Sequence, residues 1–101
     1  MFVSVKNKLS AQEAAIALMY EVVSNIDNGN INKRAYVYVV NDADLVYVRI
    51  EFRNDDKKYD KYFMQFFKTS EKYNLAQVKT YMNALLLSIY SAGYMGIPKN
   101  V

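Results

Sequence analysis

Two segments of the chain carry apolar residues every three or four positions, which is the period of an amphipathic helix. The first begins at Ser10-Ala-Gln-Glu13, a capping box in which each of the two side chains accepts a hydrogen bond from the other residue's backbone amide. This signal predicts a helix from Ala11 to about Ile26, ended by the turn-forming residues Asp27-Asn28-Gly29-Asn30. Its predicted buried stripe is Ala15, Leu18, Met19, Val22, Val23 and Ile26. The residues left for water are Gln12, Glu13, Glu21, Ser24 and Asn25.

The second helical segment lies in the last third of the chain. Asn74 is placed to cap it with Gln77 three residues on, and Tyr73 and Val78 are spaced to form a hydrophobic staple. We expect Gly93 to end this helix. Its predicted buried stripe is Val78, Met82, Leu85, Ile89 and Ala92, widened by Leu86, Leu87 and Tyr90. So wide a stripe predicts that this helix is the more deeply packed of the two.

Three runs rich in Val, Ile, Tyr and Phe separate the helices, at residues 34–40, 45–53 and 59–68. Short, turn-prone linkers join them, which is typical of a meander of two hairpins. A brief alternation at Met1 to Lys6 predicts a further edge strand. We therefore predict a single two-layer α+β domain over residues 1–101, with a three- to four-stranded antiparallel sheet, two helices packed on one face and the order (β)-α-β-β-β-α. The tail from Tyr94 to Val101 is expected either to dock on the domain or to remain flexible.

Alternation within each strand predicts which residues face the helices. In the middle run these are Val46, Val48, Ile50 and Phe52, and the residues pointing away are Leu45, Tyr47, Arg49, Glu51 and Arg53. In the first run Val37 and Val39 are predicted inward, with Tyr36 and Tyr38 outward. In the third run the inward set is Tyr62, Met64 and Phe66, and the outward set is Tyr59, Lys61, Phe63, Gln65 and Phe67. The outer face is thus expected to be both aromatic and basic.

Such a face has three explanations. Aromatic side chains of a sheet can stack bases while Arg and Lys hold phosphates. Tyr, Phe and Arg are also enriched in protein interfaces, so a protein partner or a second copy fits equally well. Alternatively, the aromatic residues only reflect β-propensity and cross-strand pairing. The candidate binding residues are Tyr36, Tyr38, Tyr47, Arg49, Arg53, Lys61 and Phe63.

Composition narrows the chemistry. The chain has no Cys and no His, which excludes a thiolate metal site and a cysteine nucleophile and removes the usual general base near neutral pH. The pairs Asp42/Asp44 and Asp55/Asp56 are expected as turn residues, because neither has the loop length or distal Glu of a cation site. We therefore expect no enzyme activity, no metal and no cofactor.

The charge balance does not select a partner. The formal net charge is +3, from 13 basic and 10 acidic residues, which is mild for a nucleic-acid binder. Glu51 in the outer face and the acidic turns would repel a phosphate backbone. The element order resembles that of the double-stranded-RNA-binding domain. That family, however, uses a histidine-bearing loop and a Lys-rich start of its last helix, whereas Glu71-Lys72-Tyr73-Asn74 holds one lysine.

The function expected from the sequence is a non-enzymatic protein-interaction module. Its size and lack of catalytic residues suit a small accessory or inhibitor protein of a phage or mobile element, acting through the sheet face or self-associating as a homo-oligomer. The alternative is a single-stranded nucleic-acid or RNA-binding domain that uses the same face. With neither a leader peptide nor a membrane span in the sequence, a cytoplasmic location without membrane contact is expected.

Overall fold

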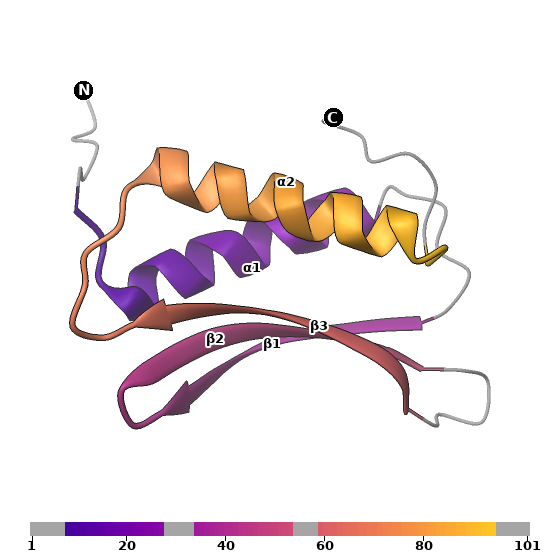
Figure 1. The fold of residues 1–101 in the computed structure, drawn as a ribbon, viewed down its shortest axis with the longest axis horizontal. Helices are drawn as coiled ribbons and strands as arrows, with labels where there is room; N and C mark the ends of the chain where they lie inside the picture. Colours follow the sequence, from indigo (N-terminus) through magenta and orange to yellow (C-terminus); the bar gives the residue numbers. More distant parts are fainter. Residues whose placement is uncertain (1–7, 28–33, 54–58, 95–101) are drawn as a thin grey trace.

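The fold has two layers, a three-stranded antiparallel sheet and a pair of helices that both lie on one of its faces (Figure 1). The computed structural model describes residues 8–27, 34–53 and 59–94. The elements, in chain order, are α1 (Ala11–Asp27), β1 (Arg34–Asp42), β2 (Leu45–Arg53), β3 (Tyr59–Lys68) and α2 (Leu75–Ser91). The strand order β1-β2-β3 confirms the predicted meander. The strand predicted at residues 1–6 lies outside the described residues, so a fourth strand is not shown.

Both helices begin at the predicted caps. The Glu13 amide donates to Ser10 Oγ (3.1 Å) and the Ser10 amide to Glu13 Oε1 (2.9 Å). Asn74 and Gln77 form the same reciprocal pair at 2.8 and 2.9 Å. After α2, Gly93 takes a φ of +85° and its amide donates to the Tyr90 carbonyl, as in a Schellman ending. These local signals therefore set the helix boundaries.

The core lies between the helices and the inner face of the sheet. Val37 faces Ile50 and Val39 faces Val48 across the β1–β2 pair, as predicted. The largest fully buried side chains are Phe52, Phe67, Leu18, Ile50, Leu86, Ile89, Val22, Val48 and Val78. The tail residue Tyr94 completes one end of this core, since its ring lies 4.8 Å from that of Phe52.

The predicted orientation of β3 is wrong. Phe67 is fully buried and Phe63 packs against the core, whereas Tyr62 and Phe66 are 42% and 43% exposed on the other face. The register explains this, because Phe63 pairs with Ile50 and Phe67 with Val46, both of which face the helices. Aromatic residues stand at both parities of β3, so alternation alone could not choose the inner set.

The helix predictions need two further corrections. Asn25 was expected in water but is 4% exposed, and its Nδ2 donates to the Glu21 carbonyl (2.8 Å) and to Met82 Sδ (3.6 Å). α2 is also less deeply packed than α1: among the described elements, the backbone of α1 lies close to all three strands, whereas that of α2 lies close to β3 and α1. Its predicted inward residues Leu87, Tyr90 and Ala92 are therefore exposed. Within the described part of the chain, neither helix is long and apolar enough to cross a membrane.

Candidate functional site: the outer face of the sheet

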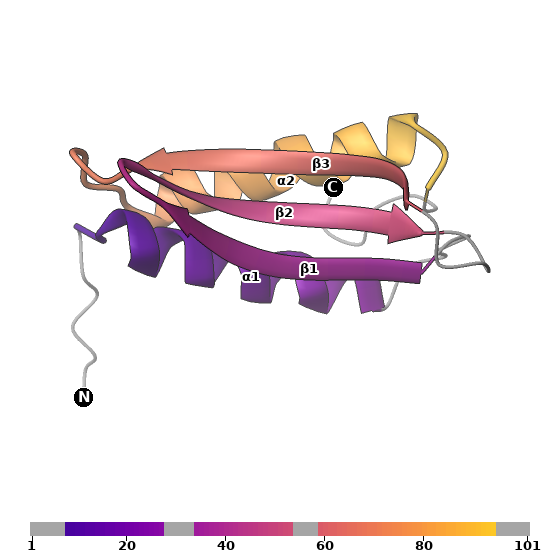
Figure 2. The same ribbon diagram turned by 90° about the horizontal axis from the view of Figure 1, so that it is seen from below.

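The sheet face opposite the helices is left uncovered by the described elements (Figure 2). All three strands contribute to it through residues that alternate with the core positions. We call this surface the outer face and define it by Tyr36, Tyr38, Tyr47, Arg49, Glu51, Arg53, Tyr62, Met64 and Phe66.

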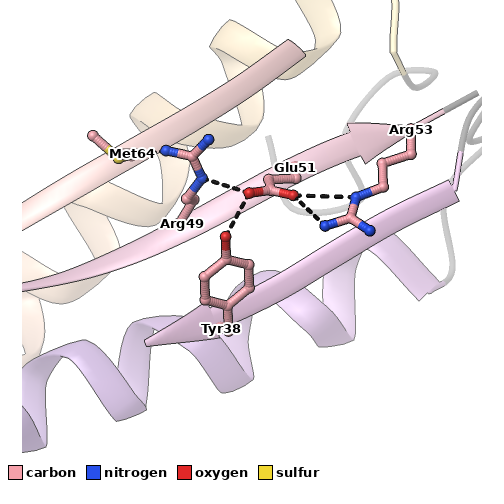
Figure 3. Close-up of polar contacts among 5 residues, drawn as sticks. All are labelled: Tyr38, Arg49, Glu51, Arg53 and Met64. Carbon is pink, nitrogen blue, oxygen red and sulfur yellow. Dashed lines mark hydrogen bonds and ion pairs between the residues drawn. The ribbon is translucent and has the colours of Figure 1, made fainter. Parts of the chain in front are cut away.

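Glu51 lies at the centre of the outer face and is only 8% exposed (Figure 3). Its Oε2 accepts hydrogen bonds from the Tyr38 hydroxyl (2.5 Å) and from Arg49 Nε (2.7 Å). Its Oε1 accepts from Arg53, at 2.7 Å from the terminal nitrogen and 3.2 Å from Nε. Both carboxylate oxygens are thus fully engaged by neighbours on β1 and β2.

These contacts follow from the strand geometry. Arg49, Glu51 and Arg53 stand at alternate positions of β2, so all three side chains leave the same side of the sheet. Tyr38 reaches Glu51 from β1, where it pairs with Arg49 and is therefore diagonal to the carboxylate. A pattern that reads Arg-x-Glu-x-Arg on a strand places a carboxylate between two guanidinium groups.

Each arginine also stacks on a tyrosine of a neighbouring strand. The guanidinium carbon of Arg49 lies 4.1 Å from the ring centroid of Tyr62, and that of Arg53 lies 4.4 Å from the ring centroid of Tyr36. Arg49 additionally points a terminal nitrogen at Met64 Sδ (3.6 Å). The ring quadrupole and the carboxylate together hold both cations against the sheet.

The ionisation of the group reflects these bonds. The Tyr38 hydrogen bond, followed by those of Arg53 and Arg49, lowers the pKa of Glu51 from 4.5 to about 2. Burial, followed by the hydrogen bond to Glu51, raises the pKa of Tyr38. The hydrogen bond to Glu51 likewise raises the pKa of Arg53. At neutral pH the cluster therefore holds one negative and two positive charges, most of which cancel within the face.

The rest of the outer face is aromatic. Tyr47 and Phe66 pack against each other with ring centroids 5.2 Å apart. Tyr38, Tyr62 and Phe66 remain between 36% and 43% exposed although each contacts its neighbours. The face therefore presents aromatic rings around an ionic centre in which one carboxylate is paired with two guanidinium groups.

Five of the seven predicted binding residues lie together on this face: Tyr36, Tyr38, Tyr47, Arg49 and Arg53. Lys61 and Phe63 do not. Phe63 is half-buried in the core with its ring 5.9 Å from that of Phe52. Lys61, two residues earlier in β3, lies at the same parity as Phe63 and pairs with Phe52, and its side chain is exposed. Their predicted place on the outer face is wrong because β3 has the opposite orientation.

Tyr62, Met64 and Phe66 belong to the outer face although they were predicted to point inward, and Glu51 was expected only to repel a phosphate backbone. A usable signal was present for Glu51, since the flanking arginines two residues away on each side are its partners. No comparable signal was available for β3, whose orientation depends on its register with β2.

Other potential chemistry is sparse. Among the described residues no three acidic groups come together to hold a metal ion. Glu51 is the one carboxylate buried in that part of the chain, and it has no second carboxylate beside it. Among the described residues Glu51 therefore forms no acid–base pair with another carboxylate.

A second feature lies on the helix layer. A surface hollow of about 380 Å³ lies between the two helices and is lined by Ala17, Tyr20, Glu21, Leu75, Val78 and Lys79. Tyr20 is 68% exposed at its rim.

Comparison with known proteins gave no relative: no family model, curated protein or solved structure matched this chain.

Proposed function

We propose that the chain is a non-enzymatic protein-interaction module that binds a partner protein through its outer face. The size and the expected lack of catalytic residues are consistent with a small accessory or inhibitor protein. The observation that carries the proposal is the Glu51 cluster, in which a buried carboxylate holds Arg49 and Arg53 flat against tyrosine rings.

This arrangement favours a protein partner over a phosphate backbone. A phosphate would have to compete with Glu51 for both arginines, and removing a partner from a buried carboxylate is unfavourable. The displaced position of Lys61 takes a further cation away from the face. In contrast, rigid Tyr, Phe and Arg side chains with little rotamer freedom are typical of the energetic centres of protein interfaces.

The test compares three forms of the chain as bait for affinity capture from host cells with quantitative mass spectrometry. The first is the native chain, and the second is a Tyr62→Ala, Phe66→Ala variant that trims the exposed rings without touching the core. A Tyr20→Ala, Leu75→Ala variant, which removes exposed apolar groups from the helix layer instead, is the matched control.

We expect at least one protein to be retained by the native chain and the control and lost from the outer-face variant, with the interaction then reproduced by the two purified proteins. Equal retention by all three forms would contradict the proposal. Binding of a fluorescent oligonucleotide at low salt, abolished by Arg49→Ala and Arg53→Ala, would favour the nucleic-acid alternative instead.

A further inference from the structure

The free edge of β1 is a second candidate interaction surface, distinct from the outer face. β1 is an edge strand of nine residues, and within the described ranges no other strand pairs with its far side. From Ala35 to Val40 the strand contains no Lys, Pro or Gly. Natural edge strands usually carry such residues, or a bulge or cover, to prevent pairing with another chain.

The hydrogen-bond pattern identifies the backbone groups at this edge. The Thr69 amide donates to the Asp44 carbonyl (3.0 Å), so the even-numbered residues of β2 bond toward β3 and the odd-numbered residues toward β1. The β1 partners of those odd-numbered residues, Tyr36, Tyr38 and Val40, therefore bond toward β2. The N–H and C=O groups directed away from the sheet belong to Ala35, Val37, Val39 and Asn41.

The opposite edge of the sheet is different. At the end of β3, the Lys68 amide donates to the Tyr73 hydroxyl (2.7 Å) and the Phe66 carbonyl accepts from Gln65 Nε2 (3.1 Å). Both groups belong to the outward-bonding set of β3 and are satisfied by the chain's own side chains. β1 is thus the more open edge of the two.

The helix layer is wider than the sheet beneath it. Two helices packed at about 9 Å and each about 10 Å across cover roughly 19 Å, whereas three strands spaced at about 4.8 Å cover roughly 14 Å. Figure 2 shows the result, with α1 extending past β1 at one edge of the sheet and α2 extending past β3 at the other. At the β1 edge the overhanging helix therefore lies above backbone groups that the described strands leave open.

The part of α1 that overhangs is apolar. Its flank toward α2 carries Ala17 and Glu21, so Ile16, Met19 and Val23 occupy the opposite flank, above the free edge. All three are half-exposed. Val37 and Val39 below them are also only half-buried, unlike Val48 and Ile50 in β2, which are fully buried. The core is therefore incomplete along this edge.

We propose that the β1 edge accepts one extended peptide segment of a partner protein as a fourth strand beneath α1. Its backbone pairs with Ala35, Val37, Val39 and Asn41, and apolar side chains at alternate positions pack against the α1 flank. A second copy of the chain is disfavoured because its own α1 would occupy the same overhang. A strand formed by the residues before α1 would need a left-handed crossover to reach this edge, which is rare.

The test uses a displayed library of random peptides, from which those that bind the full chain are selected. The peptides have about ten residues, which is the usual upper length of a strand. We expect the selected peptides to share alternating apolar residues and to shift the amide resonances of Ala35, Val37, Val39 and Asn41. Val39→Pro removes an outward amide without removing a β1–β2 hydrogen bond, and should weaken binding by about tenfold or more. Val23→Glu, which places a charge on the half-exposed flank of α1, should also weaken peptide binding. This variant tests the same site without introducing a proline into β1.

The outer-face variant Tyr62→Ala, Phe66→Ala should bind the selected peptides as the native chain does, which separates this proposal from the previous one. Peptides unaffected by both Val39→Pro and Val23→Glu would overturn it. A native dimer that Val39→Pro converts to monomer would assign the edge to a second copy, and peptide binding that appears only after deletion of residues 1–7 would assign it to the chain's own N-terminal segment. Either result would also overturn the proposal.

Discussion

Glu51 shows how one residue can define a surface. The carboxylate is buried at the solvent-facing side of a sheet, where a charge is normally exposed, and it is stable there because Tyr38, Arg49 and Arg53 replace its water. The same three bonds fix the positions of the side chains that a partner would contact. Glu51 therefore has a structural role in the outer face.

The lowered pKa of Glu51 predicts a defined acid sensitivity. With a folded pKa of about 2 and an ordinary value of 4.5, the unfolded chain takes up a proton first as the pH falls. The stabilising contribution of Glu51, about 2 to 3 kcal/mol after allowance for its partly exposed partners, is complete above pH 4.5 and lost as the pH falls toward 2. It can be measured as urea unfolding of the native chain and of Glu51→Gln between pH 2 and pH 7.

We expect the gap in unfolding free energy between the two proteins to narrow steadily below pH 4.5. Tyr38→Phe is a second, milder variant: it removes the hydrogen bond that lowers the pKa of Glu51 most, so the difference of about 1 kcal/mol that it causes should narrow over the same pH range. A gap that is as large at pH 3 as at pH 7 would show that the carboxylate is not held in its ionised form by these contacts.

At the level of elements, local signals were sufficient for boundaries but not for orientation. Both helix starts, the Gly93 ending and the three strands were predictable because caps, turns and β-branched runs act over a few residues. The inner set of β2 was predictable because its apolar residues stand at one parity. The inner set of β3 could not be predicted in this way, because aromatic residues stand at both parities: Tyr62 and Phe66 at one, Phe63 and Phe67 at the other. Only the pairing with β2 decides which pair faces the core.

The same limit explains the misplaced part of the outer face. Five residues on β1 and β2 could be assigned to it from alternation, whereas Lys61 and Phe63 were assigned by a parity that tertiary pairing reverses. The low exposure of Asn25 was also beyond the sequence pattern, because it depends on the approach of Met82 from α2.

The β1–β2 hairpin carries a testable strain. Its two-residue loop holds Ala43 at a φ of +52°, a left-handed conformation that costs an alanine about 1 kcal/mol. Ala43→Gly should therefore raise the stability by about 0.5 to 1 kcal/mol and the midpoint of thermal unfolding by about 4 °C. Calorimetry of the two proteins gives both quantities.

Ala84→Gly is the matched control for that hairpin change. Ala84 is exposed within α2, so the same substitution there should lower the stability by about 1 kcal/mol. If Ala43→Gly lowers the stability as Ala84→Gly does, the hairpin loop is not strained at Ala43.

Across the whole molecule the two helices are not equivalent. Among the described elements, the backbone of α1 lies close to all three strands, whereas that of α2 lies close to β3 and α1, and Leu75, Leu87 and Tyr90 of α2 are exposed. The two proposed interaction surfaces, the outer face and the β1 edge, lie on sides that neither helix closes.

This asymmetry predicts the order of local unfolding. Amide hydrogen exchange measured by NMR should be slowest in the central strand β2, and slower in α1 than in α2, because protection follows the number of packed neighbours that must be lost. α2 amides that exchange more slowly than those of α1 would show that α2, rather than α1, is the anchored layer.

The bridge between Leu9 and Tyr73 has a consequence for the growing chain on the ribosome. These residues exchange two backbone hydrogen bonds (2.6 and 2.9 Å) across 64 positions of sequence, and the Tyr73 ring packs on Phe67 at the same point. The residues just before α1 can form these hydrogen bonds only after β3 and Tyr73 have left the exit tunnel. Until Tyr73 has emerged, the start of α1 lacks these two hydrogen bonds, so we expect this end of the first helix to be fixed late in synthesis.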